Sequence, residues 1–329
     1  MTVPAQTVQT FAMVGIREDL SDAISNIDPT ETPLYSRFKK GKCDNRTPEW
    51  QIDTRRDANA NNKVVEGSDA TNKAVTPTTR LKNVVQLFEG TVQVSTTANA
   101  VKTAGRANEM DYQVAKEGEA LKRDIEARIS GNYPSVLGAD DTPGEMAGFE
   151  AWITSNDNRG GGAAAQGGFN TGTGLVAAAN DGTQRALTET IFREFIRGCW
   201  MNGAKIPLVV TGASNKQTMS GFSGIAQATN DVKSSERVTI VGAADVYVSD
   251  YGRHTIIPSR LSRDRTVLGV DPAFWEVSFL QPFKRGKLAK TGHSEREMLS
   301  CECTLKSRNE KANGVIADLT VTGPVEEGT

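Results

Sequence analysis

Residues 55–80 of this chain are RRDANANNKVVEGSDATNKAVTPTTR, and this stretch decides how the fold must be built. Its only branched aliphatic side chains are Val64, Val65 and Val75. A connection of this length is usually functional or disordered. Ordering it would cost roughly 1–2 kcal/mol per residue, and its own apolar content is too small to recover that cost. We therefore predict an arm that gains its contacts from another subunit.

Strand-like segments lie on both sides of this stretch, at residues 48–53 and 84–94. In each segment apolar and polar side chains alternate, as in Trp50-Gln51-Ile52 and around Val92 and Val94. Such alternation is typical of half-exposed strands. We predict that the two segments flank a very long β-hairpin, each half of which could reach up to about 75 Å if fully extended.

The composition is that of an ordinary soluble protein. Of the 329 residues, 37% are apolar and 24% are charged, which suits two domains or one domain with insertions. The chain has no run of about 18 apolar residues and no secretory signal, so we expect neither a membrane span nor export. The net charge is −2 and the basic residues are scattered, so any contact with DNA is expected to be incidental.

Helical periodicity marks two segments. Leu20, Ile24 and Ile27 recur at helical spacing and predict a short amphipathic helix in an N-terminal arm. From Ala107 to Ser130 the apolar residues lie near one face and charged residues cover the remainder. This second pattern predicts a helix of about 36 Å.

The remainder of the chain alternates between glycine-rich and compact segments. Residues 160–174 contain seven glycines, which predicts a flexible loop without regular structure. After it, residues 187–201 predict an amphipathic helix and residues 207–211 a buried strand, so a compact α/β unit begins here. Further strands are predicted at residues 238–241, 245–249, 255–257, 274–280, 298–305 and 314–322.

No active site is recognisable. The two histidines, His254 and His293, are the only imidazole bases, and no GxSxG motif supplies a serine for them. Gly172 and Gly174 match a dinucleotide pattern only loosely, because no strand precedes them. We expect no catalytic residue, no cofactor and no metal. The cysteines lack metal-ligand spacing and are predicted to be structural thiols: Cys43, Cys199, Cys301 and Cys303.

Several short motifs, in their order along residues 17–319, make the chain similar to the SU10-type major head protein family of tailed bacteriophages. The motifs are REDLSD (17–22), DPTETP (28–33), EWQ (49–51), EG with DA (66–70), LKRDIE (121–126), LAKTG (288–292) and TLKSRNEKA (304–312). The resemblance implies an α+β fold of the HK97-like capsid type. It divides the chain into an N-terminal arm (1–38), an extended E-loop hairpin (39–100), a peripheral domain with a long spine helix (101–185 and 282–329) and an axial domain (186–281).

The resemblance also implies a function and a set of partners. The chain is expected to be a major capsid protein that assembles as hexamers and pentamers into an icosahedral or prolate shell around double-stranded DNA, which it contacts non-specifically. No long scaffolding segment precedes the arm, so separate scaffolding, portal and decoration proteins are expected, with assembly in the host bacterial cytoplasm. Residues expected at the subunit interface are Leu20, Ile24, Ile27, Trp50, Arg55, Arg56, Lys63, Glu66, Lys73 and Arg80.

Two other classes of protein compete with this interpretation. A soluble enzyme could use the polar stretch as an active-site lid, but it would need convergent polar groups with perturbed pKa values in a pocket. A capsid-decoration or scaffolding protein would be shorter or more uniformly helical than this chain. Electron microscopy of the overexpressed protein would separate these classes, because only the capsid protein should form shells or sheets.

Overall fold

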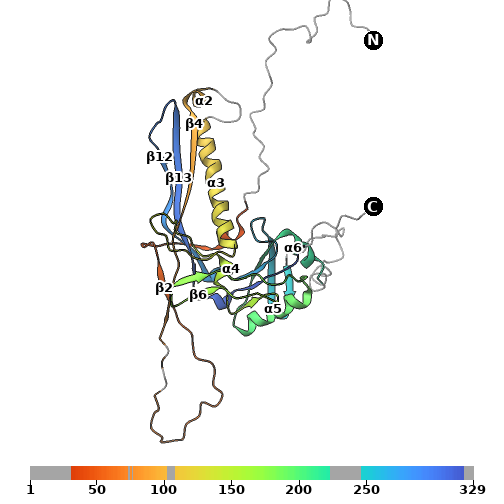
Figure 1. The fold of residues 1–329 in the computed structure, drawn as a ribbon. Coiled ribbons are helices and arrows are strands. Elements are labelled where there is room, and N and C mark those ends of the chain that lie inside the picture. The colour runs from red at the N-terminus through yellow and green to blue at the C-terminus, as the bar shows by residue number, and fades with distance from the viewer. Residues whose placement is uncertain (1–30, 73–74, 76, 102–107, 223–245, 322–329) are drawn as a thin grey trace, which may run out of the picture.

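A computed structural model describes residues 31–72, 75, 77–101, 108–222 and 246–321. The predicted helix around Leu20 and the predicted strand at residues 238–241 lie outside these ranges. Figure 1 shows an elongated molecule in which a long sheet and a long helix run side by side. A second sheet with its own helices lies beside their base, and a loop projects from this base in the direction opposite to the long sheet.

The long sheet has four strands. Their order is β1 (Lys39–Lys42), β12 (Trp275–Lys287), β13 (Ser294–Ser307) and β4 (Gln86–Ser95). β1 runs parallel to β12, and the other pairs are antiparallel. The strand predicted at residues 84–94 is confirmed as β4, but its pairing as the second flank of the hairpin is wrong, because β4 pairs with β13 and places Leu87 opposite Glu302. This register depends on residues more than two hundred positions apart, which local alternation does not reveal.

The predicted spine helix is confirmed as α3 (Glu109–Ser130), which packs on β4 and β13. Asn108 begins it, because its side-chain oxygen accepts a hydrogen bond from the Asp111 N–H at 3.3 Å. Leu121, Ile125 and Ile129 recur at helical spacing and are buried. The apolar face of the helix thus fixes it against the long sheet.

The second sheet is the centre of the predicted α/β unit. Its order is β5 (Asp157–Asn158), β14 (Gly314–Ile316), β11 (Val267–Val270), β8 (Leu208–Thr211), β10 (Gly252–Pro258) and β9 (Val246–Ser249). β8 is fully buried, as predicted. Two helices complete the unit, α5 (Glu189–Met201) against β14 and α6 (Ala213–Ser220) against β10. The predicted helix at residues 187–201 is confirmed.

Two short hairpins and several short helices connect these layers. β2 (Glu49–Ile52) pairs with β3 (Thr79–Lys82), and β6 (Gly168–Asn170) pairs with β7 (Leu175–Ala177). The second hairpin corrects the prediction that residues 160–174 lack regular structure, since Gly174, at φ +67°, lets the chain turn back. The short helices are α1 (Pro33–Arg37), α2 (Thr96–Ala100), α4 (Phe149–Trp152), η3 (Pro272–Phe274) and η4 (Glu310–Ala312).

The two sheets share one hydrophobic core, which includes Trp275 and Leu305 of the long sheet with Val210 and Val270 of the second sheet, and a further cluster lies against α5. Under the long sheet, Trp275 is fully buried and packs on Phe38 and Phe149, with ring centroids 5.8 and 4.6 Å away. Under the second sheet, Phe192 of α5 packs edge-on against Tyr247 of β9 at 5.0 Å. Apolar packing therefore joins the base of the long sheet to one face of the second sheet.

Candidate subunit interface

The base of the projecting loop is attached firmly to the subunit. β2 and β3 pair from Glu49 opposite Lys82 to Ile52 opposite Thr79. The Trp50 indole N–H donates to the Ser307 carbonyl at 2.7 Å, and its ring lies 5.7 Å from that of Trp152. We expected Trp50 at the subunit interface. Its partly buried side chain instead makes these contacts within its own chain.

The loop beyond this base is entirely solvated in the free subunit. Every described residue from 53 to 78 is exposed, and Figure 1 shows the segment extending away from the body. Val64 and Val65 are each 79% exposed and Val75 is 90% exposed. The ladder between β2 and β3 ends at Ile52 and Thr79, so the hairpin is short and its loop long. The arm predicted from composition is confirmed, whereas its long ladder is not.

Local hydrogen bonds shape the loop in two places. The Asn59 side-chain oxygen accepts from the Asn61 N–H at 2.9 Å, and its carbonyl accepts from the Asn62 N–H at 3.2 Å. Further along, the Ser68 N–H donates to the Val65 carbonyl at 3.1 Å across Gly67, whose φ is +81°. Turns of this kind give the loop local form without joining it to a core.

The remaining predicted interface residues fall into two groups. Arg55, Arg56, Lys63 and Glu66 are exposed on the loop, and Arg80 at its base pairs with Glu49 at 3.1 Å. The others lie outside the described residues: Leu20, Ile24, Ile27 and Lys73. The structure therefore brings the loop residues together on one projection and leaves their interface role a prediction.

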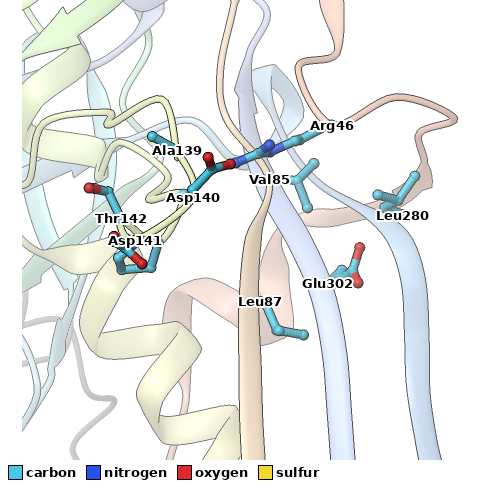
Figure 2. Close-up of a pocket in the computed structure, with 11 residues that line it drawn as sticks. Arg46, Val85, Leu87, Ala139, Asp140, Asp141, Thr142, Leu280 and Glu302 are labelled. Atoms are coloured by element: carbon cyan, nitrogen blue, oxygen red, sulfur yellow. The ribbon is translucent and has the colours of Figure 1, made fainter.

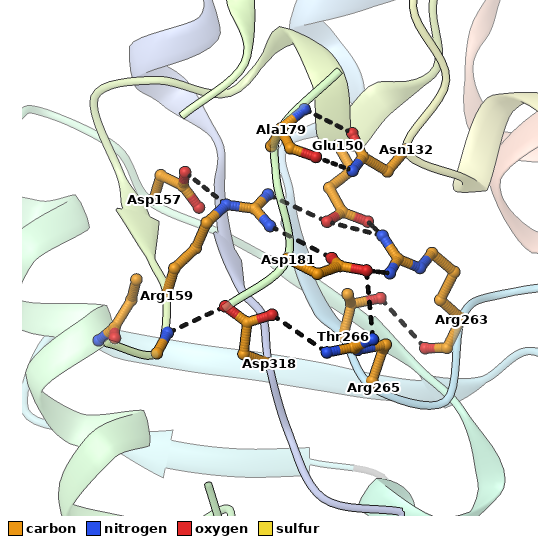
Figure 3. A network of polar contacts seen from close by, with 12 residues as sticks. Asn132, Glu150, Asp157, Arg159, Ala179, Asp181, Arg263, Arg265, Thr266 and Asp318 are labelled. Carbon is orange, nitrogen blue, oxygen red and sulfur yellow. Dashed lines mark hydrogen bonds and ion pairs between the residues drawn. The ribbon is translucent and has the colours of Figure 1, made fainter. Parts of the chain in front are cut away.

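A buried charged junction, which sequence reasoning missed, links α4 and β5 to the segment between β10 and β11 (Figure 3). Glu150 of α4 is fully buried and accepts from Arg159 at 3.0 Å and from Arg263 at 3.2 Å. Arg159 also donates to Asp157 of β5 at 2.7 Å. Burial raises the pKa of Glu150, and the two arginines act in the opposite direction. The carboxylate thus holds together segments that are far apart in the sequence.

The junction continues toward the end of β14. Asp181 accepts from Arg263 at 2.6 Å and pairs with Arg265 at 3.2 Å. Asp318 lies 3.4 Å from Arg265 and accepts from the Gly160 N–H at 3.0 Å. These contacts connect the glycine-rich segment to the second sheet. The sequence signal that could have revealed the junction is Glu150 itself, an isolated carboxylate within the apolar run 146–153.

Another buried carboxylate marks where the N-terminal segment meets the spine helix. Glu126 of α3 accepts from the backbone N–H groups of Leu34 and Tyr35 at 3.0 and 2.6 Å. Burial raises the pKa of Glu126, and these two hydrogen bonds lower it in part. Lys40 lies over the Tyr35 ring at 3.3 Å, and burial lowers the pKa of Lys40 to about 8. The start of the described chain is therefore fixed to the spine helix near its C-terminal end.

His254 and the four cysteines lie in the interior, whereas His293 is exposed. His254 is buried, with Nδ1 2.7 Å from the Ile206 carbonyl and Nε2 2.7 Å from the Ser249 hydroxyl. Burial lowers its pKa. Cys43, Cys199, Cys301 and Cys303 are buried free thiols. Over the described ranges, no group of three acidic, histidine or cysteine residues could hold a metal ion, and no helix is long and apolar enough to cross a membrane.

An open cleft of about 640 Å³ lies at the base of the long sheet. Figure 2 shows Leu87, Leu280 and Glu302 from the strands facing a turn that carries Asp140 and Asp141. The cleft therefore combines an apolar floor with acidic side chains. Its lining contains no nucleophile with a paired base.

Comparisons with known proteins agree on the class of this molecule. A model of the SU10 major capsid protein family matches residues 3–320. The major capsid protein of Escherichia phage Phieco32 is 25% identical over 339 residues, covering 94% of this chain and 96% of that protein. The resemblance to a head protein family, predicted from the order of short motifs, is confirmed.

Solved structures extend the agreement to the fold. The cyanophage A-1(L) capsid subunit has a TM-score of 0.66 at 11% identity, covering 93% of this chain and 97% of its own. The capsid of a native GTA particle has a TM-score of 0.61 at 10% identity, covering 96% and 100%. At such low identity the likeness concerns the fold alone. The predicted α+β, HK97-like architecture is confirmed.

Proposed function

The chain belongs to the SU10 major capsid protein family and is a major capsid protein of a tailed bacteriophage, and from this premise we propose that residues 53–78 clasp a neighbouring subunit in the virion shell. The observation that carries the proposal is the complete exposure of the loop on a subunit whose other elements are well packed. An ordered segment of this length needs an external partner. In a shell of identical chains, that partner is a second copy.

We propose that the four parts implied by the resemblance act as functional units, with two differences from the expected bounds: residue 281 falls within β12, and β5 and β14 of the expected peripheral segments belong to the second sheet. The proposed peripheral domain contains α3, and the proposed axial domain contains α5, β8 and α6 with the strands β9 to β11. The proposed E-loop region, residues 39–100, contributes β1 and β4 to the long sheet and projects only its central part. We propose that this central part acts between subunits while the ends anchor it.

The N-terminal arm has the same proposed role from the other end of the chain. Glu126 fixes Leu34 and Tyr35 on the spine helix, so the described chain begins close to a fixed point on the body. We propose that Leu20, Ile24 and Ile27 dock on a neighbouring subunit, since a helix this short is marginal by itself. Replacing Leu20 and Ile24 with aspartate should weaken shells toward denaturant and leave the subunit folded.

We propose hexamers and pentamers as the assembly units, with separate scaffolding, portal and decoration proteins and assembly in the host cytoplasm. Family membership supports this set of partners. We also propose that the chain carries no enzymatic activity. The two ring nitrogens of His254 already serve hydrogen bonds inside the axial unit, which supports a structural role for the residue.

The experiment compares trypsin digestion of free subunits with that of purified shells. Arg55, Arg56 and Lys63 are exposed cleavage sites in the free subunit, and assembly should protect them. Mass spectrometry of the first fragments gives the rate at each site. Subunits released from the same shells and refolded are the control, because they should regain the fast cleavage.

A deletion sharpens the test. Removing residues 59–76 leaves β2 and β3 connected by a short loop, so the subunit should stay soluble and folded by circular dichroism. It should fail to form stable shells in electron micrographs. Equal cleavage of the loop in subunits and shells, or stable shells from the deletion variant, would show that the loop is surface decoration.

A further inference from the structure

The floor of the cleft in Figure 2 is formed by apolar side chains that are open to solvent in the free subunit. Leu87, the second residue of the edge strand β4, is 56% exposed. Leu280 of β12 and Pro143 lie beside it in the same cleft. An apolar side chain placed at the bottom of a cleft of about 640 Å³ gains most when another apolar side chain covers it.

The rim of the cleft is acidic. Asp140 and Asp141 are exposed at the tip of a tight turn, which two backbone hydrogen bonds between Ala139 and Thr142 close at 2.9 and 3.2 Å. Glu302 of β13 lines the other side. Against these three carboxylates the cleft presents one basic side chain, Arg46, so its formal charge is −2. The cleft therefore fits a segment that is both apolar and basic.

The first half of the projecting loop has this character. Residues 55–65 contain three basic side chains, Arg55, Arg56 and Lys63, against the single acid Asp57, which gives a formal charge of +2. Lys63 is followed directly by Val64 and Val65, each 79% exposed. The loop thus presents a cation and two uncovered valines in adjacent positions.

We propose that residues 63–65 of a neighbouring subunit dock in this cleft, with the valines covering Leu87 and the Lys63 ammonium facing Asp140 and Asp141. The proposal rests on the intersubunit clasp described above and names its receiving surface. The attraction between Lys63 and the two aspartates determines the register, that is, which loop residues enter the cleft. The apolar contact between the valines and Leu87 supplies most of the binding free energy. The cleft then becomes the site where one subunit of the shell holds the next.

A second copy fits better than another part of the same chain. Figure 1 shows the loop extending away from the sheet that carries the cleft. Residues 1–30 carry one basic and four acidic side chains, residues 223–245 two and three, and residues 322–329 two acids only. Each of these segments is net acidic and would be repelled by the acidic rim.

Disulfide trapping between two tagged chains tests the contact. One chain carries Val65→Cys and the other Leu87→Cys, and the two are assembled together and mildly oxidised. A dimer that contains both tags should form with a yield several-fold above that of a control pair in which Met201→Cys replaces Leu87→Cys. Met201 is 74% exposed on α5, so it is the more accessible partner for random collisions. Equal yields from the two pairs would overturn the proposal.

Charge exchange tests the register. Lys63→Glu and Asp141→Lys should each lower the yield of shells several-fold, and the two substitutions together should restore it. Both positions are exposed in the free subunit, so each variant should keep its circular dichroism and denaturation midpoint. Full assembly of both single variants, or no recovery in the double variant, would overturn the proposed register.

Protease protection of the same particles separates the two proposals. If the loop is protected but Val65 does not cross-link to Leu87, the clasp stands and its placement in this cleft is overturned. If the loop is cleaved as fast in shells as in subunits, both proposals fail. If Leu87→Cys cross-links within one chain, or to a segment other than the loop, a different occupant fills the cleft and the proposal is overturned.

Discussion

The projecting loop and the buried junction use the same residue types for opposite purposes. In the junction, Arg159, Arg263 and Arg265 meet carboxylates inside the subunit, and Glu150 has no exposed surface. In the loop, Arg55 and Arg56 are exposed. Composition alone does not distinguish the two sets, because both are arginines accompanied by acids.

The difference shows how one chain divides its charges between folding and assembly. A buried ion has already lost its hydration, so its partners must be supplied within the subunit or the fold is destabilised. An exposed ion keeps its hydration and contributes little to subunit stability. Its charge remains available to a neighbour. The comparison therefore predicts large stability effects in the junction and small ones in the loop.

The largest effect is expected for Glu150→Ala. The substitution leaves Arg159 and Arg263 without their shared acceptor in a buried site. The free energy of unfolding of the free subunit should fall by about 3–5 kcal/mol. Urea denaturation followed by tryptophan fluorescence measures it. Glu66→Ala in the loop is the matched control and should change the same quantity by less than about 0.5 kcal/mol.

Comparable losses for Glu150→Ala and Glu66→Ala would contradict the comparison, because they would mean that burial does not separate the two regions. Glu150→Gln refines the measurement. It keeps the size of the side chain and one acceptor oxygen but removes the charge that faces the two arginines. Its loss of stability should lie between those of the wild type and of Glu150→Ala.

A pH-dependent effect of intermediate size is expected at Asp157. Burial raises the pKa of Asp157 from 3.8 to about 6, although Arg159 acts in the opposite direction. Between pH 3.8 and about 6, Asp157 is therefore protonated to a greater extent in the folded state than in the unfolded state. Protonation of Asp157 therefore stabilises the folded state at low pH, and this contribution to the free energy of unfolding is lost as the pH rises through about 6.

Asp157→Asn isolates this contribution because asparagine does not titrate. Between pH 7 and pH 5 the wild type should gain stability relative to the variant, measured from urea midpoints at each pH. The contribution of His254 to the pH dependence has the opposite sign, since burial lowers its pKa and acidification therefore favours the unfolded state. Both proteins contain His254, so its contribution cancels when their stabilities are subtracted. A difference that stays constant or reverses sign would contradict the assignment.

Short-range sequence patterns predicted the elements whose structure depends on residues close together in the chain. The spine helix follows from the spacing of Leu121, Ile125 and Ile129, and the exposed arm follows from the scarcity of apolar residues in the loop. Motif order, and not periodicity, supplied the capsid fold as a whole. These features needed no knowledge of which strands pair.

Long-range pairing explains what the sequence did not predict. β4 alternates like a hairpin flank, yet it pairs with β13, because the apolar face of α3 needs a sheet beneath it. The junction unites Glu150 with Asp318 through arginines that lie between them in the sequence. The exposure of the loop residues was predicted from composition, whereas Trp50 was assigned to the interface although its indole donates to Ser307 of its own chain.

The smallest effect is expected for Arg80→Ala at the base of the loop. Arg80 pairs with Glu49 at 3.1 Å across β2 and β3, but the two side chains are 69% and 41% exposed. Exposed pairs of this kind contribute about 0.2–1 kcal/mol, because water and salt screen the attraction. The unfolding free energy of the free subunit should therefore change by less than about 1 kcal/mol, and the change should shrink further in high salt. Measuring it beside Glu150→Ala under identical conditions compares two arginine–carboxylate contacts of similar length. A loss of several kcal/mol at Arg80 would mean that the hairpin base is part of the subunit core, and the loop could then no longer be treated as an element held out for its neighbour.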